Sequence, residues 1–252
     1  MKILLINDDG YGAEGITVLA DVLRKHHEVW ILAPSENRSG ASSCIIMNRQ
    51  LPLRKKAVNE YALDGTPTDC VLCALKGDLF PSKPDVVFSG INKYGNLGTD
   101  ILYSGTCAAA KEATLQGIPS IALSVEPVSA NGNERFDYES LALFAEKNMN
   151  VLVGLCTDKT FLNVNAPSVV PYAGVQFASL SKRFYNDKVN IIIKNDEKVY
   201  STCAGGAEVS FEGDTSNDSL LVKKGYVAIS SVYAEPVADL SLCAKSTNQF
   251  VL

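Results

Sequence analysis

The chain has 252 residues, of which 46% are hydrophobic and 20% are charged, a balance typical of a globular protein with a full core. Its formal net charge of -5 at pH 7 disfavours a nucleic-acid duplex or an anionic membrane as a partner, since both attract basic proteins. The sequence shows neither a charged-then-apolar leader nor an apolar run of about 18 residues, so we expect no membrane contact and a cytoplasmic location.

The first predicted element is the short apolar strand Ile3-Leu4-Leu5-Ile6, of the kind that is buried on both faces of a parallel sheet. It runs into Asn7-Asp8-Asp9-Gly10, and residues 15–23 then carry apolar side chains at helical spacing. Ligands of open α/β sheets gather at the carboxyl ends of the strands. Two adjacent carboxylates repel each other there, and a hard cation such as Mg²⁺ would relieve the repulsion. The alternative is ordinary turn chemistry, with an acid capping the helix and a glycine at positive φ.

A second strand, residues 28–34, closes a β-α-β unit and leads into a polar loop at the same edge of the sheet. In this loop Ser39 could offer its hydroxyl to a metal, and Gly40 would let the backbone approach closely; a flexible surface loop is the alternative. Further on, Thr66-Pro67-Thr68-Asp69 has the pattern of a capped helix start. We expect a packing helix from there to about Leu79.

The next buried strand, residues 85–89, is followed by a loop rich in glycine and asparagine. Asn92 in this loop is placed where its amide oxygen could bind a metal shared with the first strand. Ser104-Gly105-Thr106 then opens an alanine-rich helix, whose free N–H groups and two hydroxyls would form a phosphate cradle.

The remaining elements complete an α/β fold with a mostly parallel sheet. We predict strands at 119–125 and 161–167, a helix over 138–149, and β-hairpin material at 175–181, 188–194 and 199–203. Residues 1–180 would form the α/β core, and residues 181–252 a hairpin and a carboxyl-terminal arm that pairs with the core or with another subunit. The seven cysteines, an odd number in apolar surroundings, are expected to be reduced thiols.

In their order along the chain, these motifs resemble the survival protein SurE family of metal-dependent 5′/3′-nucleotidases. The resemblance is close over the amino-terminal half and thinner beyond it. It rests on Asn7-Asp8-Asp9-Gly10, Gly15-Ile16, Ala33-Pro34, Ser39-Gly40, Gly65-Thr66-Pro67-Thr68-Asp69, Ser89-Gly90-Ile91-Asn92, Asn96-Leu97-Gly98, Tyr103-Ser104-Gly105-Thr106, Gly117-Ile118-Pro119 and Leu162-Asn163-Val164-Asn165-Ala166-Pro167. One departure is visible at Tyr94, which stands where the family usually has glycine.

The resemblance implies one divalent metal ion per subunit, Mg²⁺ or Mn²⁺. The metal ligands that it implies are Asp8, Asp9, Ser39 and Asn92, and the residues near the phosphate are Asn96, Ser104, Gly105 and Thr106. It also implies a Rossmann-like three-layer sandwich, and a homodimer or homotetramer in which subunits exchange a carboxyl-terminal arm.

The leading functional hypothesis is a phosphomonoesterase that hydrolyses nucleoside 5′- and 3′-monophosphates. Asp8 would hold the metal, and Asp9 would help to hold it or would orient or deprotonate the attacking water, while an aspartyl-phosphate route stays open. A receiver-like or nucleotide-sensing module that binds metal and phosphate without turnover is the alternative. Against it, such a module would place a lysine after a late strand, where this chain has Ser124-Val125-Glu126.

Overall fold

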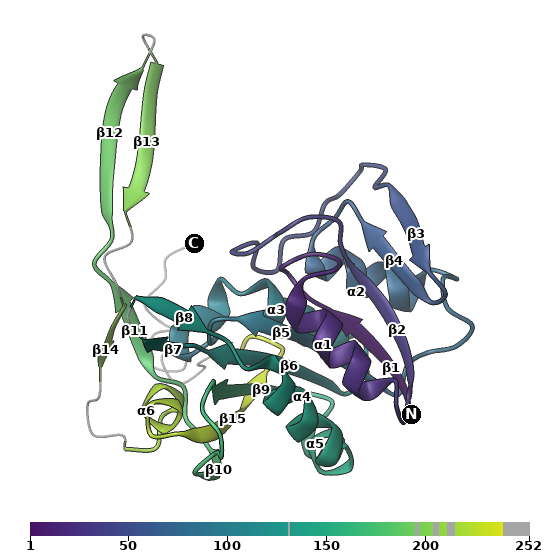
Figure 1. Cartoon of the computed structure of the whole chain (residues 1–252). Coiled ribbons are helices and arrows are strands. Elements are labelled where there is room, and N and C mark those ends of the chain that lie inside the picture. The colour runs from purple at the N-terminus through teal and green to yellow at the C-terminus, as the bar shows by residue number, and fades with distance from the viewer. Residues whose placement is uncertain (131, 195–196, 204–206, 211–214, 239–252) are drawn as a thin grey trace, which may run out of the picture.

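The computed structural model describes residues 1–252 except 131, 195–196, 204–206, 211–214 and 239–252. At its centre is a nine-stranded sheet with the strand order β10-β15-β9-β6-β5-β1-β2-β4-β3 (Figure 1). The strands are β1 Lys2–Ile6, β2 Glu28–Pro34, β3 Leu53–Ala57, β4 Glu60–Leu63, β5 Val86–Lys93, β6 Ser120–Glu126, β9 Thr160–Pro167, β10 Gly174–Phe177 and β15 Tyr226–Tyr233. Within this sheet β3 with β4 and β9 with β15 are antiparallel, and the other pairs are parallel. The predicted mostly parallel sheet is confirmed.

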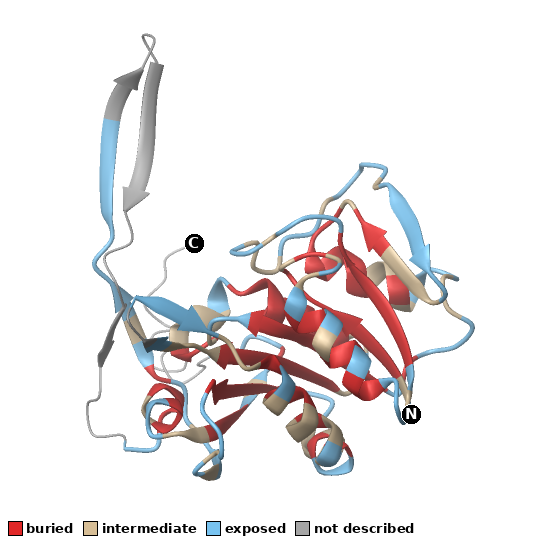
Figure 2. Ribbon diagram, in the orientation of Figure 1, coloured by how far each residue is buried: buried red, intermediate tan, exposed pale blue. Residues whose placement is uncertain are grey.

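Helices cover both faces of the sheet and complete a three-layer sandwich (Figures 1 and 2). One face carries α1 Glu14–Leu23, α4 Tyr138–Lys147 and α5 Met149–Leu155, and the other carries α2 Pro67–Lys76 and α3 Gly105–Leu115. The sequence of β1 is apolar without a break because both sides of the strand are packed. Ile3 and Leu5 pack into the core under α1, while Leu4 and Ile6 pack into the core under α2 and α3. Each face of the strand is buried, so each position needs an apolar side chain.

The predicted cap of the α2 helix is confirmed. The Thr66 hydroxyl accepts a hydrogen bond from the Asp69 backbone N–H at 3.1 Å, and the Asp69 carboxylate accepts one from the Thr66 N–H at 2.9 Å. This reciprocal pair satisfies two of the donors that a helix start leaves without partners. The helix ends at Lys76, three residues earlier than Leu79.

Three sequence predictions need correction. The helix expected over 138–149 breaks at Asn148 into α4 and α5, and α5 continues to Leu155. Residues 174–177 form no hairpin: they are β10, which pairs in parallel with β15 because a long crossover separates the two strands. The strand expected to end at Ser89 continues to Lys93, so Asn92 lies within β5 rather than in a loop.

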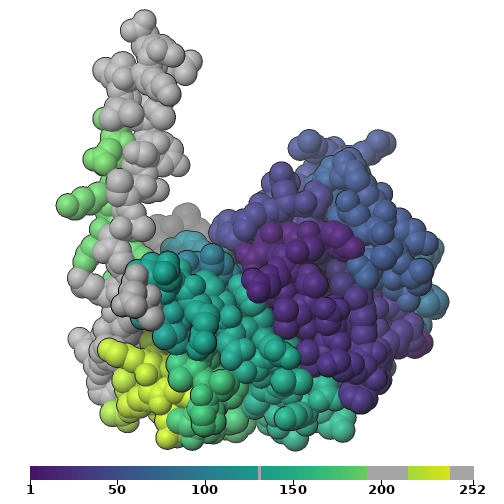
Figure 3. All heavy atoms as spheres, in the orientation of Figure 1, coloured from purple at the N-terminus to yellow at the C-terminus, as the bar shows by residue number. Residues whose placement is uncertain are grey.

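The segment after β10 builds a projecting arm. It contains β11 Lys182–Tyr185, paired with β14 Ala207–Ser210, and the hairpin of β12 Lys188–Lys194 with β13 Glu197–Cys203. The hairpin stands away from the body of the molecule (Figure 1), as the coloured part of β12 does in Figure 3, and residues 195–196 between its strands lie outside the described residues. Helix α6, Asp218–Lys223, then leads into β15, so the main sheet also draws on residues beyond 180.

Three short elements complete the structure near the carboxyl edge of the sheet. They are the 3₁₀ helix η1 Gly98–Leu102 and the small ribbon of β7 Val128–Ala130 with β8 Asn133–Arg135. None of the helices in the described part of the chain has the length and apolar character needed to cross a bilayer.

Candidate active site

A cleft of about 1080 Å³ opens at the carboxyl ends of β1 and β5. Its walls also include the loop after β2, the residues that lead into α3, and strand β11 from the arm. Among the residues with an expected role, it brings together Asp8, Ser39, Asn92, Asn96 and Ser104. Asp9, Gly105 and Thr106 do not line the cleft but lie directly behind it, in the contacts given below.

Asp8 is the most deeply enclosed acid of the site, with 3% of its surface exposed. Burial raises the pKa of its carboxyl group, and a hydrogen bond from the Thr106 hydroxyl to Oδ1, at 2.6 Å, opposes that rise. The backbone N–H groups of Gly105 and Thr106, at the start of α3, also oppose it. Several hydrogen-bond donors therefore converge on the Asp8 carboxylate, and these bonds favour its ionised form.

Asp9 is half-buried beside it. Burial raises the pKa of Asp9 to about 6, and the neighbouring charge of Asp8 adds to the rise. The backbone N–H of Lys93 lies 3.5 Å from the Asp9 Oδ2, a weak contact that stabilises the charged form only slightly. The hydrogen bonds to Asp8 stabilise one of the two enclosed carboxylates, and a bound cation would offset the repulsion that remains between the pair.

The turn after β1 does not need these acids. Asn7 closes it, accepting from the Gly10 N–H at 3.3 Å and donating to the Gly10 carbonyl at 2.9 Å, and Gly10 has a φ of 104°. Helix α1 begins after Ala13 without any side-chain cap. The alternative reading, in which an acid caps this helix, is therefore wrong, whereas the glycine at positive φ is confirmed.

Asn92 and Ser39 present oxygens to the same cleft. The Asn92 amide donates from Nδ2 to the carbonyl of Tyr94 at 2.8 Å, which orients its Oδ1 as an acceptor away from that contact. Ser39 is exposed, and its loop is tied to the site because the Arg38 N–H donates to the Asp8 carbonyl at 2.6 Å. Two carboxylates, an amide oxygen and a hydroxyl form a donor set that suits a hard divalent cation.

Two side chains of strand β9 bind the backbone of Asn96. Its backbone N–H donates to Asn165 Oδ1 at 2.8 Å, and its carbonyl accepts from the side-chain amides of Asn163 and Asn165 at 2.8 and 3.2 Å. The Asn96 side chain bonds Ser124 on β6 at 2.8 Å. All four side chains are buried, so this polar network fixes the backbone of the loop between β5 and η1.

The start of α3 packs tightly against the acidic end of the cleft. The Ser104 hydroxyl caps the helix by accepting from the Cys107 N–H at 3.0 Å. Gly105 follows, and a Cβ at this position would lie 2.7 Å from the Asp8 Cβ and 3.0 Å from Pro67 Cγ. The absence of a side chain at Gly105 is what allows the helix start to reach Asp8.

The far wall of the cleft contains groups that the sequence analysis did not find. The guanidinium of Arg183 forms an ion pair with Asp100 at 3.0 Å, and the Tyr185 hydroxyl donates to the same carboxylate at 2.6 Å. The Arg183 backbone exchanges two hydrogen bonds with the Thr99 hydroxyl, at 2.9 and 3.1 Å. These contacts anchor β11 to η1. Arg183 and Lys93 are basic residues of the cleft lining, and Arg183 is already paired with Asp100.

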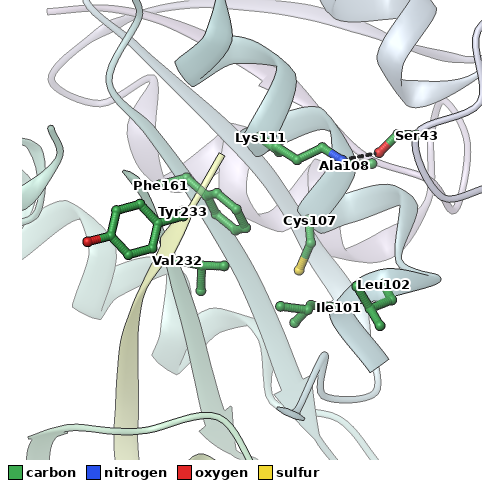
Figure 4. A pocket seen from close by; sticks show the side chains of 9 residues that line it. All are labelled: Ser43, Ile101, Leu102, Cys107, Ala108, Lys111, Phe161, Val232 and Tyr233. Atoms are coloured by element: carbon green, nitrogen blue, oxygen red, sulfur yellow. Dashed lines mark hydrogen bonds between the residues drawn. The ribbon is translucent and has the colours of Figure 1, made fainter. Parts of the chain in front are cut away.

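A second, smaller cavity of about 120 Å³ lies behind η1 and α3 (Figure 4). It is mainly apolar, with Phe161, Val232 and Tyr233 on one side, and the ammonium of Lys111 bonds the Ser43 hydroxyl at its edge. The Cys107 thiol points into it, and burial raises the pKa of that thiol to about 12, so the thiol stays protonated and inert. The cavity contains none of the predicted site residues among those that the structure describes.

Fold and site together define a Rossmann-like α/β protein with an oxygen-rich, acidic centre at the carboxyl edge of its sheet. The model of the family described as "Survival protein SurE" matches residues 3–187. The 5′-nucleotidase SurE of Pelotomaculum thermopropionicum is 39% identical over 245 residues, covering 92% of this chain and 89% of the relative. That of Campylobacter jejuni strain 81116 is 36% identical over 243 residues, covering 94% and 93%. The chain belongs to the survival protein SurE family.

A solved structure supports the same conclusion. The crystal structure of the SurE protein from Aquifex aeolicus superposes with a TM-score of 0.82 at 30% sequence identity, over 99% of this chain and 100% of that one. The three-layer fold expected from the sequence is thereby confirmed.

Proposed function

We propose that this chain is a divalent-metal-dependent 5′-nucleotidase, which hydrolyses nucleoside 5′-monophosphates, and also 3′-monophosphates, to nucleoside and phosphate. The observation that carries the proposal is the adjacency of Asp8 and Asp9 beside a cleft whose lining includes Asp8, Asn92 and Ser39. The relatives that match over most of the chain are named 5′-nucleotidases. They favour an enzyme over a receiver-like module that binds without turnover.

One divalent ion per subunit, Mg²⁺ or Mn²⁺, would be held by Asp8, Asp9, Ser39 and Asn92. The donor chemistry supports this assignment, since every ligand is an oxygen and the two charged ligands need a counter-ion. When bound, the ion would polarise the phosphoryl group and lower the pKa of water near it.

Residues of the chain would activate the water, bind the phosphate and orient Asp8. Asp9 would help to hold the ion or, alternatively, would orient the attacking water and take its proton. Ser104 and the Asn96 amide would position the phosphate. Thr106 and Gly105 would act through Asp8, because their donors converge on its carboxylate and fix its direction.

Measurement of phosphate release from adenosine 5′-monophosphate tests the proposal. We expect release with Mg²⁺ or Mn²⁺, none after chelation, and a loss of at least about 10²-fold in Asp8→Asn, which keeps an acceptor for the Thr106 hydroxyl. Asp21→Asn is the matched control, since that carboxylate is 69% exposed on α1 and distant from the cleft lining. Calorimetric titration with Mn²⁺ should show a site that Asp8→Asn weakens. Turnover by Asp8→Asn at the wild-type rate would refute the assignment.

We also propose a cytoplasmic homodimer or homotetramer that exchanges its carboxyl-terminal arm. The location is supported by the described cysteines, Cys44, Cys70, Cys73, Cys107 and Cys156, which are all free thiols. The assembly is supported by Val189 and Ile191 on the projecting hairpin, which are 60% and 70% exposed in the single chain. Light scattering on the wild type and on a Val189→Lys, Ile191→Lys double variant tests it, and an unchanged mass would contradict a role for this hairpin.

A further inference from the structure

The cleft is far from uniform in character. Asp8 and Asn92 lie at one part of it, and its lining also includes four aromatic residues: Tyr94, Tyr103, Phe184 and Tyr185, with exposed fractions of 44%, 66%, 59% and 45%. Large, exposed aromatic side chains that gather in one concave site are typical of a surface that binds a flat ligand. A phosphate group and a metal ion do not need such a surface.

Tyr94 is held by several contacts. Its hydroxyl donates to Glu134 Oε2 at 2.6 Å, and its ring meets Phe136 edge to face, with the centroids 5.2 Å apart. The ammonium of Lys93 lies 5.5 Å from the Tyr94 ring centroid and 5.0 Å from that of Phe136. The hydroxyl is therefore fixed and the Lys93 ammonium lies over one side of the ring, while the ring still lines the cleft.

The backbone of Tyr94 has a φ of 74°, in the left-handed region that favours glycine. A tyrosine costs stability at such a position, and residues held in this way cluster at ligand sites. The chain thus tolerates an unfavourable conformation to place this ring at the cleft.

Tyr94 is also coupled to the acidic end. Its carbonyl accepts the hydrogen bond from the Asn92 side chain that orients Asn92 Oδ1. Two residues span at most about 7 Å of chain, so the backbones of Asn92 and Tyr94 lie within that distance of each other.

We infer that the ring of Tyr94 is the stacking surface for the nucleobase, and that it makes the enzyme prefer purine over pyrimidine nucleotides. The inference rests on the proposed function and specifies its substrate class. A purine presents a larger π surface than a pyrimidine, and one base stacked on an aromatic side chain contributes about 1–3 kcal/mol. That range corresponds to about 5- to 150-fold in affinity. The hydroxyl of Tyr94 is occupied by Glu134, so the ring alone would make the contact.

The test compares Tyr94→Gly with wild type on adenosine 5′-monophosphate, cytidine 5′-monophosphate and ribose 5-phosphate, which lacks a base. Glycine suits the backbone at this position, so the variant is expected to fold. We expect the KM for the adenosine ester to rise about tenfold, that for the cytidine ester to rise less, and that for ribose 5-phosphate to change least. Tyr94→Phe should restore the preference for the adenosine ester.

The matched control is Tyr233→Ala, which removes an aromatic side chain that is 62% exposed and lines the smaller cavity instead. It should leave all three KM values unchanged. An equal rise for all three substrates in Tyr94→Gly, or no rise for the adenosine ester, would overturn the inference.

Titration with adenosine, which needs neither metal nor turnover, separates the two hypotheses. If the wild type releases no phosphate from any ester, the proposed function fails. Adenosine binding that Tyr94→Gly weakens would still support the base site, and binding that it leaves unchanged would overturn it.

Discussion

Gly105→Ala tests whether the acidic end of the cleft depends on the close approach of α3. The new Cβ would lie 2.7 Å from the Asp8 Cβ and 3.0 Å from Asp8 Oδ2. Carbon atoms in contact are normally about 3.5–4.0 Å apart, so the two groups must separate by roughly 1 Å. Pro67 Cγ lies 3.0 Å from the same Cβ position, so the change must relieve a second close contact as well.

A displacement of about 1 Å at a reacting group costs about 10²-fold in rate, and we expect kcat of Gly105→Ala to fall by about that factor. Overpacking in a tight site should lower the free energy of unfolding by about 1–3 kcal/mol, or a few degrees in Tm. Phosphate release at saturating adenosine 5′-monophosphate measures the first effect, and thermal unfolding measures the second.

Gly154→Ala is the matched control for this prediction. Gly154 lies on α5 with nothing within 4 Å of the added Cβ, so alanine should be neutral or slightly stabilising there. The reasoning is refuted if Gly105→Ala is folded and turns over at the wild-type rate, because Asp8 would then tolerate a contact that the structure forbids.

Three further variants test the supports of the site. Thr106→Val removes the hydroxyl that donates to Asp8 with little change in side-chain shape. Because hydrogen bonds to charged groups contribute about 1.5–3 kcal/mol, kcat should fall at least about tenfold. An unchanged kcat in steady-state kinetics would contradict this. Asn165→Ala leaves the buried Asn96 N–H without its acceptor. The free energy of unfolding measured in urea should therefore fall by about 1–3 kcal/mol, and kcat/KM should fall as well. Unchanged values of both would count against a supporting role for Asn165. Asp218→Ala removes a fully buried carboxylate that accepts hydrogen bonds from three backbone N–H groups. Because three buried donors lose their acceptor, the urea midpoint of unfolding should fall by more than it does in Asn165→Ala. A smaller fall would argue against this account.

Local signals were enough to predict much of the fold. The unbroken apolar run at residues 3–6 identified a strand buried on both faces, and Thr66 with Asp69 identified the start of α2. The polar groups that follow β1 and β5 lie at one edge because parallel neighbours end there together. For the same reason, Asp8 and Asn92 could be predicted to face one cleft.

Contacts between distant segments could not be predicted in this way. Asn163 and Asn165 alternate with apolar residues, a pattern that indicates a half-exposed strand, yet both are fully buried because they bind the Asn96 backbone. Arg183 and Tyr185 reach Asp100 across more than eighty residues, and no local pattern marks that contact. The hydrogen bond from the Thr106 hydroxyl to Asp8 also joins residues 98 positions apart.

The anchoring of β11 to η1 has a consequence for how activity arises during synthesis. The bonds between Thr99 and Arg183 join residues 84 positions apart, and contacts of such sequence separation form late, after the loop between them has closed. A nascent chain that has emerged only as far as residue 180 therefore carries the acidic centre without the wall that encloses it. Strand β11 must therefore be synthesised and bonded to η1 before the cleft has this wall.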